Sequence, residues 1–130
     1  MNRMFMNTKL HSLITAPLVT GIALLWASSA SAHAFPEETR PEVGAVLNKA
    51  PQQVWIRFDS RLEDEFSVIV VKNAAGNRVS GKTKLDPESR RSLEVGLKAL
   101  APGDYHVYWS VVSWDGHRSK GDYVFHINPK

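Results

Sequence analysis

YHVYWSVV, residues 105–112, is the clearest strand-forming stretch of the sequence. Every second position holds a large apolar or aromatic side chain: Tyr105, Val107, Trp109 and Val111. Successive side chains of a strand point to opposite faces, so these four residues share one face. Residues 123–127 repeat the pattern through Tyr123, Phe125 and Ile127. Both stretches therefore predict strands with one buried face and one wet face.

Shorter stretches with strand character lie on the N-terminal side of this segment. They cover residues 43–47, 54–58, 66–71, 78–80, 83–85 and 93–97, and turn-forming residues separate them at 50–51, 73–77, 86–89 and 101–104. Pro36 and Pro41 exclude a helix over residues 33–41, which we expect to be irregular. No stretch from residue 33 onward has a sustained helical period. About seven short strands predict an all-β fold, an antiparallel sandwich of immunoglobulin-like size, in one domain over residues 33–130.

Residues 1–32 have the composition of a secretory signal peptide. Arg3 and Lys9 precede an apolar stretch over residues 13–27, and the small residues 28–32 follow it. The apolar stretch is short for a membrane span, which needs about 20 residues. Cleavage after Ala32 would make His33 the first residue of an exported protein; cleavage after Ala30 or Ala34, or a retained anchor, is also compatible with the sequence.

Composition excludes several classes of function. Without Arg3 and Lys9, 14 of the 16 basic residues remain against 13 acidic ones, and no basic cluster suits nucleic acid. The chain has no cysteine, and its three methionines all lie within the first six residues. The predicted domain therefore has no sulfur ligand and no thiol nucleophile. No serine has the Gly-x-Ser-x-Gly setting of a nucleophile elbow.

Asp115 and His117 follow the strand over residues 105–112, and His33 follows the predicted cleavage site. Residues two apart in an extended segment project to one side, so Asp115 and His117 can face one ion. A free N-terminal His33 would add its α-amine and imidazole as a chelate. Three nitrogens and one oxygen suit Cu(II), or Zn(II) with tetrahedral geometry, whereas Cu(I) prefers sulfur. Asp-Gly-His alone is most simply a turn, with an exposed histidine after it.

Other polar and aromatic residues have simpler interpretations. His106 and His126 occupy the outward faces of their strands, where solvated histidines are normal. Trp55 and Trp109 are expected in the core. Trp114 interrupts the polar loop over residues 114–120, so we expect it to cover the metal site or to pack at the end of the sandwich.

The order of these motifs resembles the CopC family of periplasmic copper-binding proteins. The matching stretches are His33-Ala34, Gly44-Ala45-Val46-Leu47, Ala50-Pro51 with Val54-x-Ile56-x-Phe58, Leu100-x-Pro102-Gly103-x-Tyr105, Trp109-Ser110-Val111-Val112-Ser113-x-Asp115-Gly116-His117 and Gly121-x-Tyr123-x-Phe125. The resemblance implies a seven-stranded Greek-key β-sandwich or barrel and Cu(II) held by His33, Asp115 and His117. Many members carry an acid where this chain has Ser60; Asp59 is one place early and is expected to face the other way, so water or Asp59 completes the coordination.

The resulting hypothesis is a monomeric periplasmic protein, not an enzyme, that buffers, sequesters or delivers Cu(II) and has no Cu(I) site. The family resemblance implies an inner-membrane copper transporter of the CopD type as a partner. Two alternatives stay open: a copper mono-oxygenase with a histidine brace, and a structural or adhesive sandwich whose histidines are incidental.

Overall fold

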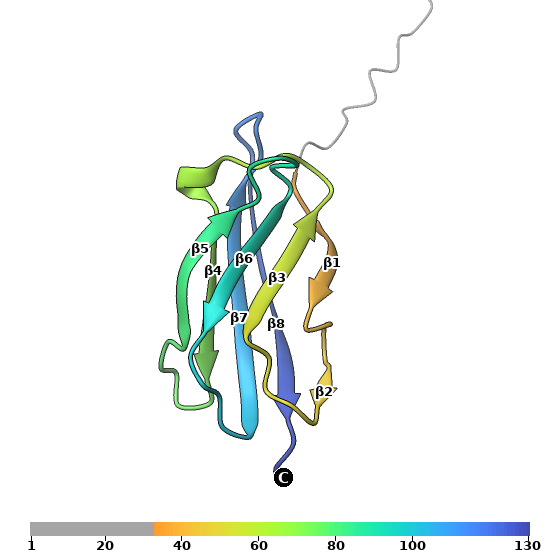
Figure 1. Ribbon diagram of the computed structural model, residues 1–130. Coiled ribbons are helices and arrows are strands. Elements are labelled where there is room, and N and C mark those ends of the chain that lie inside the picture. The colour runs from red at the N-terminus through yellow and green to blue at the C-terminus, as the bar shows by residue number, and fades with distance from the viewer. Residues whose placement is uncertain (1–32) are drawn as a thin grey trace, which may run out of the picture.

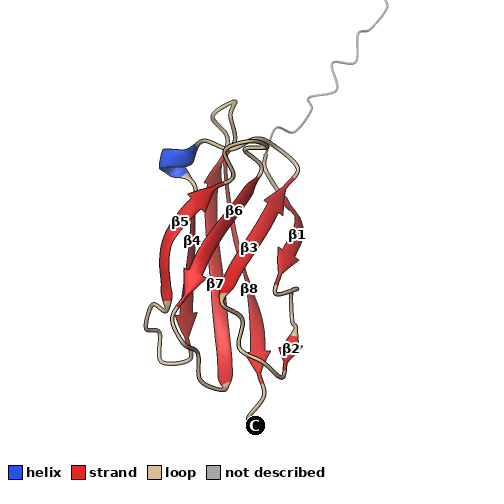
Figure 2. Cartoon of the chain, in the orientation of Figure 1, coloured by secondary structure: helices blue, strands red, loops and turns tan. Residues whose placement is uncertain are grey.

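The computed structural model describes residues 33–130, which form two four-stranded sheets packed face to face (Figure 1). The strand orders are β1-β3-β6-β5 and β2-β8-β7-β4. Apart from one short 3-10 turn, η1, the described chain consists of strands and loops (Figure 2). The elements are β1 (Pro36–Arg40), β2 (Val46–Leu47), β3 (Gln53–Phe58), η1 (Asp64–Phe66), β4 (Val68–Asn73), β5 (Ser80–Leu85), β6 (Ser92–Leu97), β7 (Gly103–Val112) and β8 (Arg118–Ile127). The all-β prediction is confirmed, while the predicted signal peptide lies outside the described residues.

The alternating side chains predicted to face inward do form the core. All of the following are buried: Val54, Ile56, Phe58, Leu93, Val95, Tyr105, Val107, Trp109, Val111, Tyr123, Phe125 and Ile127. Burying a side chain of this size stabilises a fold by about 1.5–3 kcal/mol, so the shared inner face supplies most of the favourable free energy. Trp55 differs from the prediction because it lies on the outer face of β3, beneath the guanidinium of Arg40.

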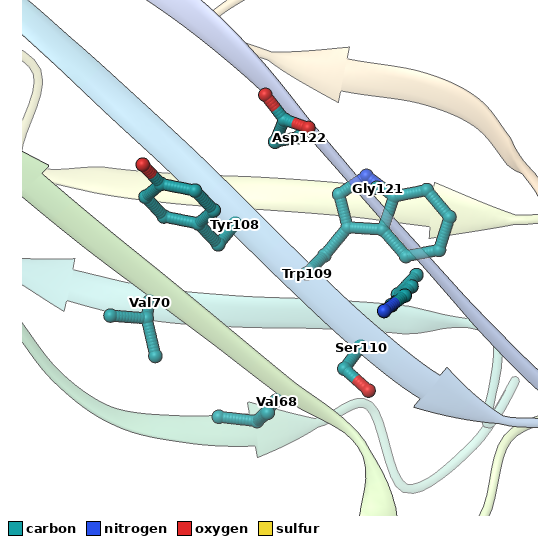
Figure 3. Close-up of a pocket in the computed structure, with 8 residues that line it drawn as sticks. Val68, Val70, Tyr108, Trp109, Ser110, Gly121 and Asp122 are labelled. Carbon is teal, nitrogen blue, oxygen red and sulfur yellow. The ribbon is translucent and has the colours of Figure 1, made fainter.

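Trp109 joins the two sheets through a contact with Phe58 of the opposite sheet. Its ring meets that of Phe58 edge to face, with the centroids 5.4 Å apart. On the neighbouring strand β8, Gly121 lies directly opposite Trp109. The indole extends across β8 at this glycine (Figure 3), and a Cβ there would lie 2.5 Å from Trp109 Cζ2. Gly121 therefore leaves the space that lets Trp109 reach Phe58.

Side-chain hydrogen bonds close one side of the sandwich between β4 and β5. The Thr83 hydroxyl accepts a hydrogen bond from the Ile69 amide at 3.0 Å, and the Ser80 hydroxyl accepts one from Val71 at 2.9 Å. On the other side the chain passes from the first sheet to the second between β1 and β2.

Several segments differ from their sequence-based predictions. Of residues 43–47 only β2 is a strand, and β5 replaces the two short pieces predicted over residues 78–85. Residues 36–40 form β1, because Pro36 begins an edge strand, where a missing N–H is tolerated. Phe66 lies in η1 and is exposed, so β4 begins two residues later. β8 begins at Arg118, which shortens the connection after β7 to residues 113–117. In addition, β2 pairs with β8 in parallel, whereas the other pairs of named strands are antiparallel.

Within residues 33–130, the structure contains no helix with the length and apolar character that a membrane crossing needs.

Replacing Gly121 with alanine should destabilise the fold, because the new methyl group would displace the Trp109 indole. We expect a loss of about 1–3 kcal/mol in the free energy of unfolding, the usual cost of overpacking. Urea unfolding followed by tryptophan fluorescence measures it. Gly96→Ala is the matched control: Gly96 also lies in a strand, but no atom lies within 4 Å of its added Cβ. Equal stabilities of the two variants would contradict this account.

Candidate metal centre

The start of the described chain and the β7–β8 turn lie at the same end of the sandwich (Figure 1). This places the imidazoles of His33 and His117 side by side, with ring centroids 5.2 Å apart and planes inclined by 57°. The predicted approach of His33 to the Asp-Gly-His turn is therefore present. The two histidines come from opposite ends of the sequence, and the strand pairing brings them together.

Backbone hydrogen bonds fix the turn that carries Asp115 and His117. The Ser113 amide donates to the His117 carbonyl at 2.9 Å, and the Gly116 amide donates to the Ser113 carbonyl at 2.8 Å. Gly116 has a φ of +91°, a conformation that favours glycine. Trp114 donates its amide to the carbonyl of Arg61 at 2.9 Å, which ties the turn to the loop after β3.

Inside this turn, three side chains form a chain of polar contacts. The buried hydroxyl of Ser113 donates to Asp115 Oδ1, and Asp115 Oδ2 lies 3.1 Å from His117 Nδ1. The Ser113 hydrogen bond is the main reason that the pKa of Asp115 lies below its ordinary value of 3.8; contacts with His117 lower it further. Asp115 is therefore a carboxylate in neutral solution. Its side chain is 24% exposed and that of His117 is 56% exposed.

Asp59 holds the segment that carries His33. Its Oδ1 accepts a hydrogen bond from the Phe35 amide at 2.9 Å, while its own amide donates to the Phe35 carbonyl at 3.0 Å. Ala34, between His33 and Phe35, is completely buried. These hydrogen bonds to the backbone of Phe35 occupy the Asp59 carboxylate, and no contact between it and His117 is present among the described residues. Asp59 positions the tail.

The other two histidines of residues 33–130, His106 and His126, lie on the outer face of β7 and β8, as predicted. His106 Nε2 lies 2.5 Å from Asp122 Oδ2, and His126 Nδ1 lies 2.6 Å from Asp104 Oδ1. Each histidine therefore pairs with an aspartate of the other strand. A shallow hollow on the same face is lined by Val68, Val70 and Tyr108, among others (Figure 3). Its lining includes a single carboxylate, Asp122, and no histidine.

The donor set suits a divalent ion that accepts nitrogen and oxygen. Among residues 33–130, no three histidine or carboxylate side chains are already arranged as a ligand set. Two imidazoles and a carboxylate nevertheless lie within one small region, and a chain beginning at His33 would add an α-amine beside them. Imidazole suits copper and zinc. Trp114, expected to cover this region or to pack on the sandwich, is 68% exposed.

Sequence comparisons match this chain to one domain family and to relatives of it. The CopC domain model matches residues 36–128. The copper transport protein CutJ of Bacillus subtilis is 37% identical over 98 residues, which cover 74% of this chain and 18% of that protein. The chain thus corresponds to less than a fifth of that relative's length. Protein YobA of Escherichia coli is 31% identical over 118 residues, covering 89% of this chain and 90% of YobA.

Solved structures of CopC and PcoC have the same fold as this chain. The crystal structure of CopC from Methylosinus trichosporium OB3b has a TM-score of 0.71 and 30% identity, and the match covers 75% of this chain and 95% of that one. PcoC, a methionine-rich copper resistance protein from Escherichia coli, has a TM-score of 0.65 at 22% identity, covering 74% and 99% of the two chains. At that identity PcoC supports the fold alone. By its sequence and its fold, this chain belongs to the CopC domain family.

Proposed function

We propose that this protein binds Cu(II) in the periplasm and buffers, sequesters or delivers it. The observation that carries the proposal is the approach of the His33 and His117 imidazoles, 5.2 Å apart at one end of a rigid sandwich. His33 would contribute its imidazole and, after cleavage of residues 1–32, its α-amine. His117 would supply the opposing nitrogen, and Asp115 an oxygen ligand or the group that orients His117.

The ligand types favour Cu(II) over Cu(I). Nitrogen and oxygen donors in a tetragonal arrangement suit Cu(II), whereas Cu(I) prefers thiolate or thioether sulfur. Residues 33–130 contain neither cysteine nor methionine. By contrast, the similar fold of PcoC belongs to a protein described as methionine-rich. Copper transport in the name of the Bacillus subtilis relative supports copper as the cargo.

A carrier role implies an acceptor for the metal, and we propose a membrane copper transporter of the CopD type. In its support, the Bacillus subtilis relative named as a copper transport protein is much longer than this chain. Such a relative would join a similar domain to other parts of one transport protein. In this proposal the present chain acts as a monomeric binding protein that releases its metal rather than as an enzyme.

Replacing His117 with alanine should weaken Cu(II) binding by more than about 100-fold, a loss beyond that of outer-sphere residues. Isothermal titration of the metal-free protein with Cu(II) measures the affinity and the stoichiometry, for which we expect one equivalent. His106→Ala is the control, because His106 is likewise a partly exposed histidine beside an aspartate. An unchanged affinity in the His117 variant would refute the site.

Removal of residues 1–32 should be needed for full affinity, since only a chain that begins at His33 has an α-amine there. We expect the uncleaved chain to bind Cu(II) at least about tenfold more weakly than the processed one, for lack of the chelate ring. Mass spectrometry identifies the first residue of the exported protein. Acetylation of that residue should reproduce the weak binding, and equal affinities would exclude the amine as a ligand.

Cu(II) affinity should fall as the pH drops below about 6, because free imidazole has a pKa near 6.5 and a protonated nitrogen cannot bind metal. Asp115 does not contribute to this loss, since its pKa lies below 3.8 and it remains ionised. Competition titrations between pH 5 and 8 test the prediction. A flat profile would show that nitrogen donors do not hold the ion.

A further inference from the structure

We propose that Ser113 is a positioning residue that acts through Asp115 to hold His117 as the Nδ1–H tautomer, so that Nε2 is the nitrogen offered to the metal. The metal-binding consequence rests on the proposed function. The tautomer itself is a property of the metal-free protein and can be tested separately.

Burial and backbone contacts hold Ser113 at the base of the turn. It is completely buried, and a bridge to Leu62 joins it to the loop after β3. Its amide donates to the His117 carbonyl at 2.9 Å, and its hydroxyl oxygen lies 3.1 Å from that same carbonyl oxygen. A buried hydroxyl must find an acceptor or lose free energy. Here the short contact is with Asp115 Oδ1.

The Ser113 hydrogen bond fixes the orientation of the Asp115 carboxylate. Asp115 Oδ1 also lies 3.4 Å from the His117 amide, so this oxygen is held on the inner side of the turn. With Oδ1 held in this way, Oδ2 is directed at the imidazole, 3.1 Å from His117 Nδ1. The two oxygens of one carboxylate thus join the buried hydroxyl to the exposed ring.

The contact with Asp115 decides which ring nitrogen carries the proton. An ionised carboxylate is only an acceptor, so Asp115 Oδ2, 3.1 Å from His117 Nδ1, favours the tautomer that carries its proton on Nδ1. In neutral imidazole the other nitrogen, Nε2, then keeps its lone pair. Metal-binding histidines generally donate their second N–H to such a carboxylate, which fixes the ring and raises its basicity. His117 is therefore prepared to bind through Nε2 before any metal arrives.

The same contacts exclude a hydrolytic role for Ser113. In a serine–histidine–aspartate triad the hydroxyl contacts the histidine, which removes its proton. Here the hydroxyl contacts the aspartate and is completely buried, so no substrate can reach it.

The tautomer can be measured by long-range ¹H–¹⁵N NMR of the histidine rings in the metal-free protein at about pH 8, where imidazole is neutral. We expect His117 to be the Nδ1–H tautomer in the parent protein and to shift toward Nε2–H in Ser113→Ala. The matched control is Ser119→Ala, which removes another buried serine hydroxyl on the adjoining strand that has no hydrogen-bond partner among the described residues. This control should leave the tautomer unchanged.

Cu(II) titration of the same variants completes the test. We expect Ser113→Ala to bind about 10- to 100-fold more weakly, as for other losses of outer-sphere partners, and Ser119→Ala to bind normally. Asp115→Asn is the second variant should Ser113→Ala fail to fold. An amide has only one acceptor oxygen, so it cannot accept from both Ser113 and His117 Nδ1, and His117 should shift toward the Nε2–H tautomer in this variant too. An Nε2–H tautomer in the parent protein would overturn the proposal, as would a Ser113→Ala protein with parent tautomer and affinity. A parent protein with the expected tautomer but no copper binding would instead contradict the proposed function alone.

Discussion

The contact between Phe58 and Trp109 ties the two sheets together and, through them, the two halves of the candidate metal centre. Phe58 ends β3, and the next residue, Asp59, holds the segment that carries His33. Trp109 lies in β7, the strand that ends in the turn with Asp115 and His117. The edge-to-face packing of the two rings, 5.4 Å apart, therefore sets how the strand ends lie relative to each other. Dense core packing of this kind resists small displacements, so the relative position of His33 and His117 is kept fixed.

Each half of the centre is made rigid in a different way. The turn half is built from local bonds: the paired backbone of residues 113–117, a glycine with positive φ, and a buried serine beneath the carboxylate. The tail half depends on distant contacts, because Asp59 and the buried Ala34 hold a segment that has no local structure of its own. Ordering both halves in advance reduces the entropy lost on binding. Two imidazoles remain at the surface, within reach of an ion and of an acceptor protein.

Residues near the strand ends were the hardest to interpret from sequence. Period-two patterning gave the inward faces of β3, β6, β7 and β8 correctly, because burial on one face leaves a direct pattern in the chain. It missed β1, whose polar residues PEETR pair with β3 at the edge of the sheet. It also gave no hint that Asp59, one residue past the end of a strand, would bond the Phe35 amide, because alternation gives no information there. The role of Ser113 was missed too; its only signal was a small polar residue at the end of an apolar strand.

The sequence by itself determined the class of fold and the chemistry of the donors. Alternation of apolar residues requires sheets with one buried face, and the lack of sulfur from residue 33 onward restricts any ligand set there to nitrogen and oxygen. Only the tertiary structure decided that His33 meets His117, that Asp59 holds the tail and that Ser113 reaches Asp115. The physical reason is that side-chain identity and periodicity are local properties, whereas these contacts depend on the pairing and packing of strands distant in the chain.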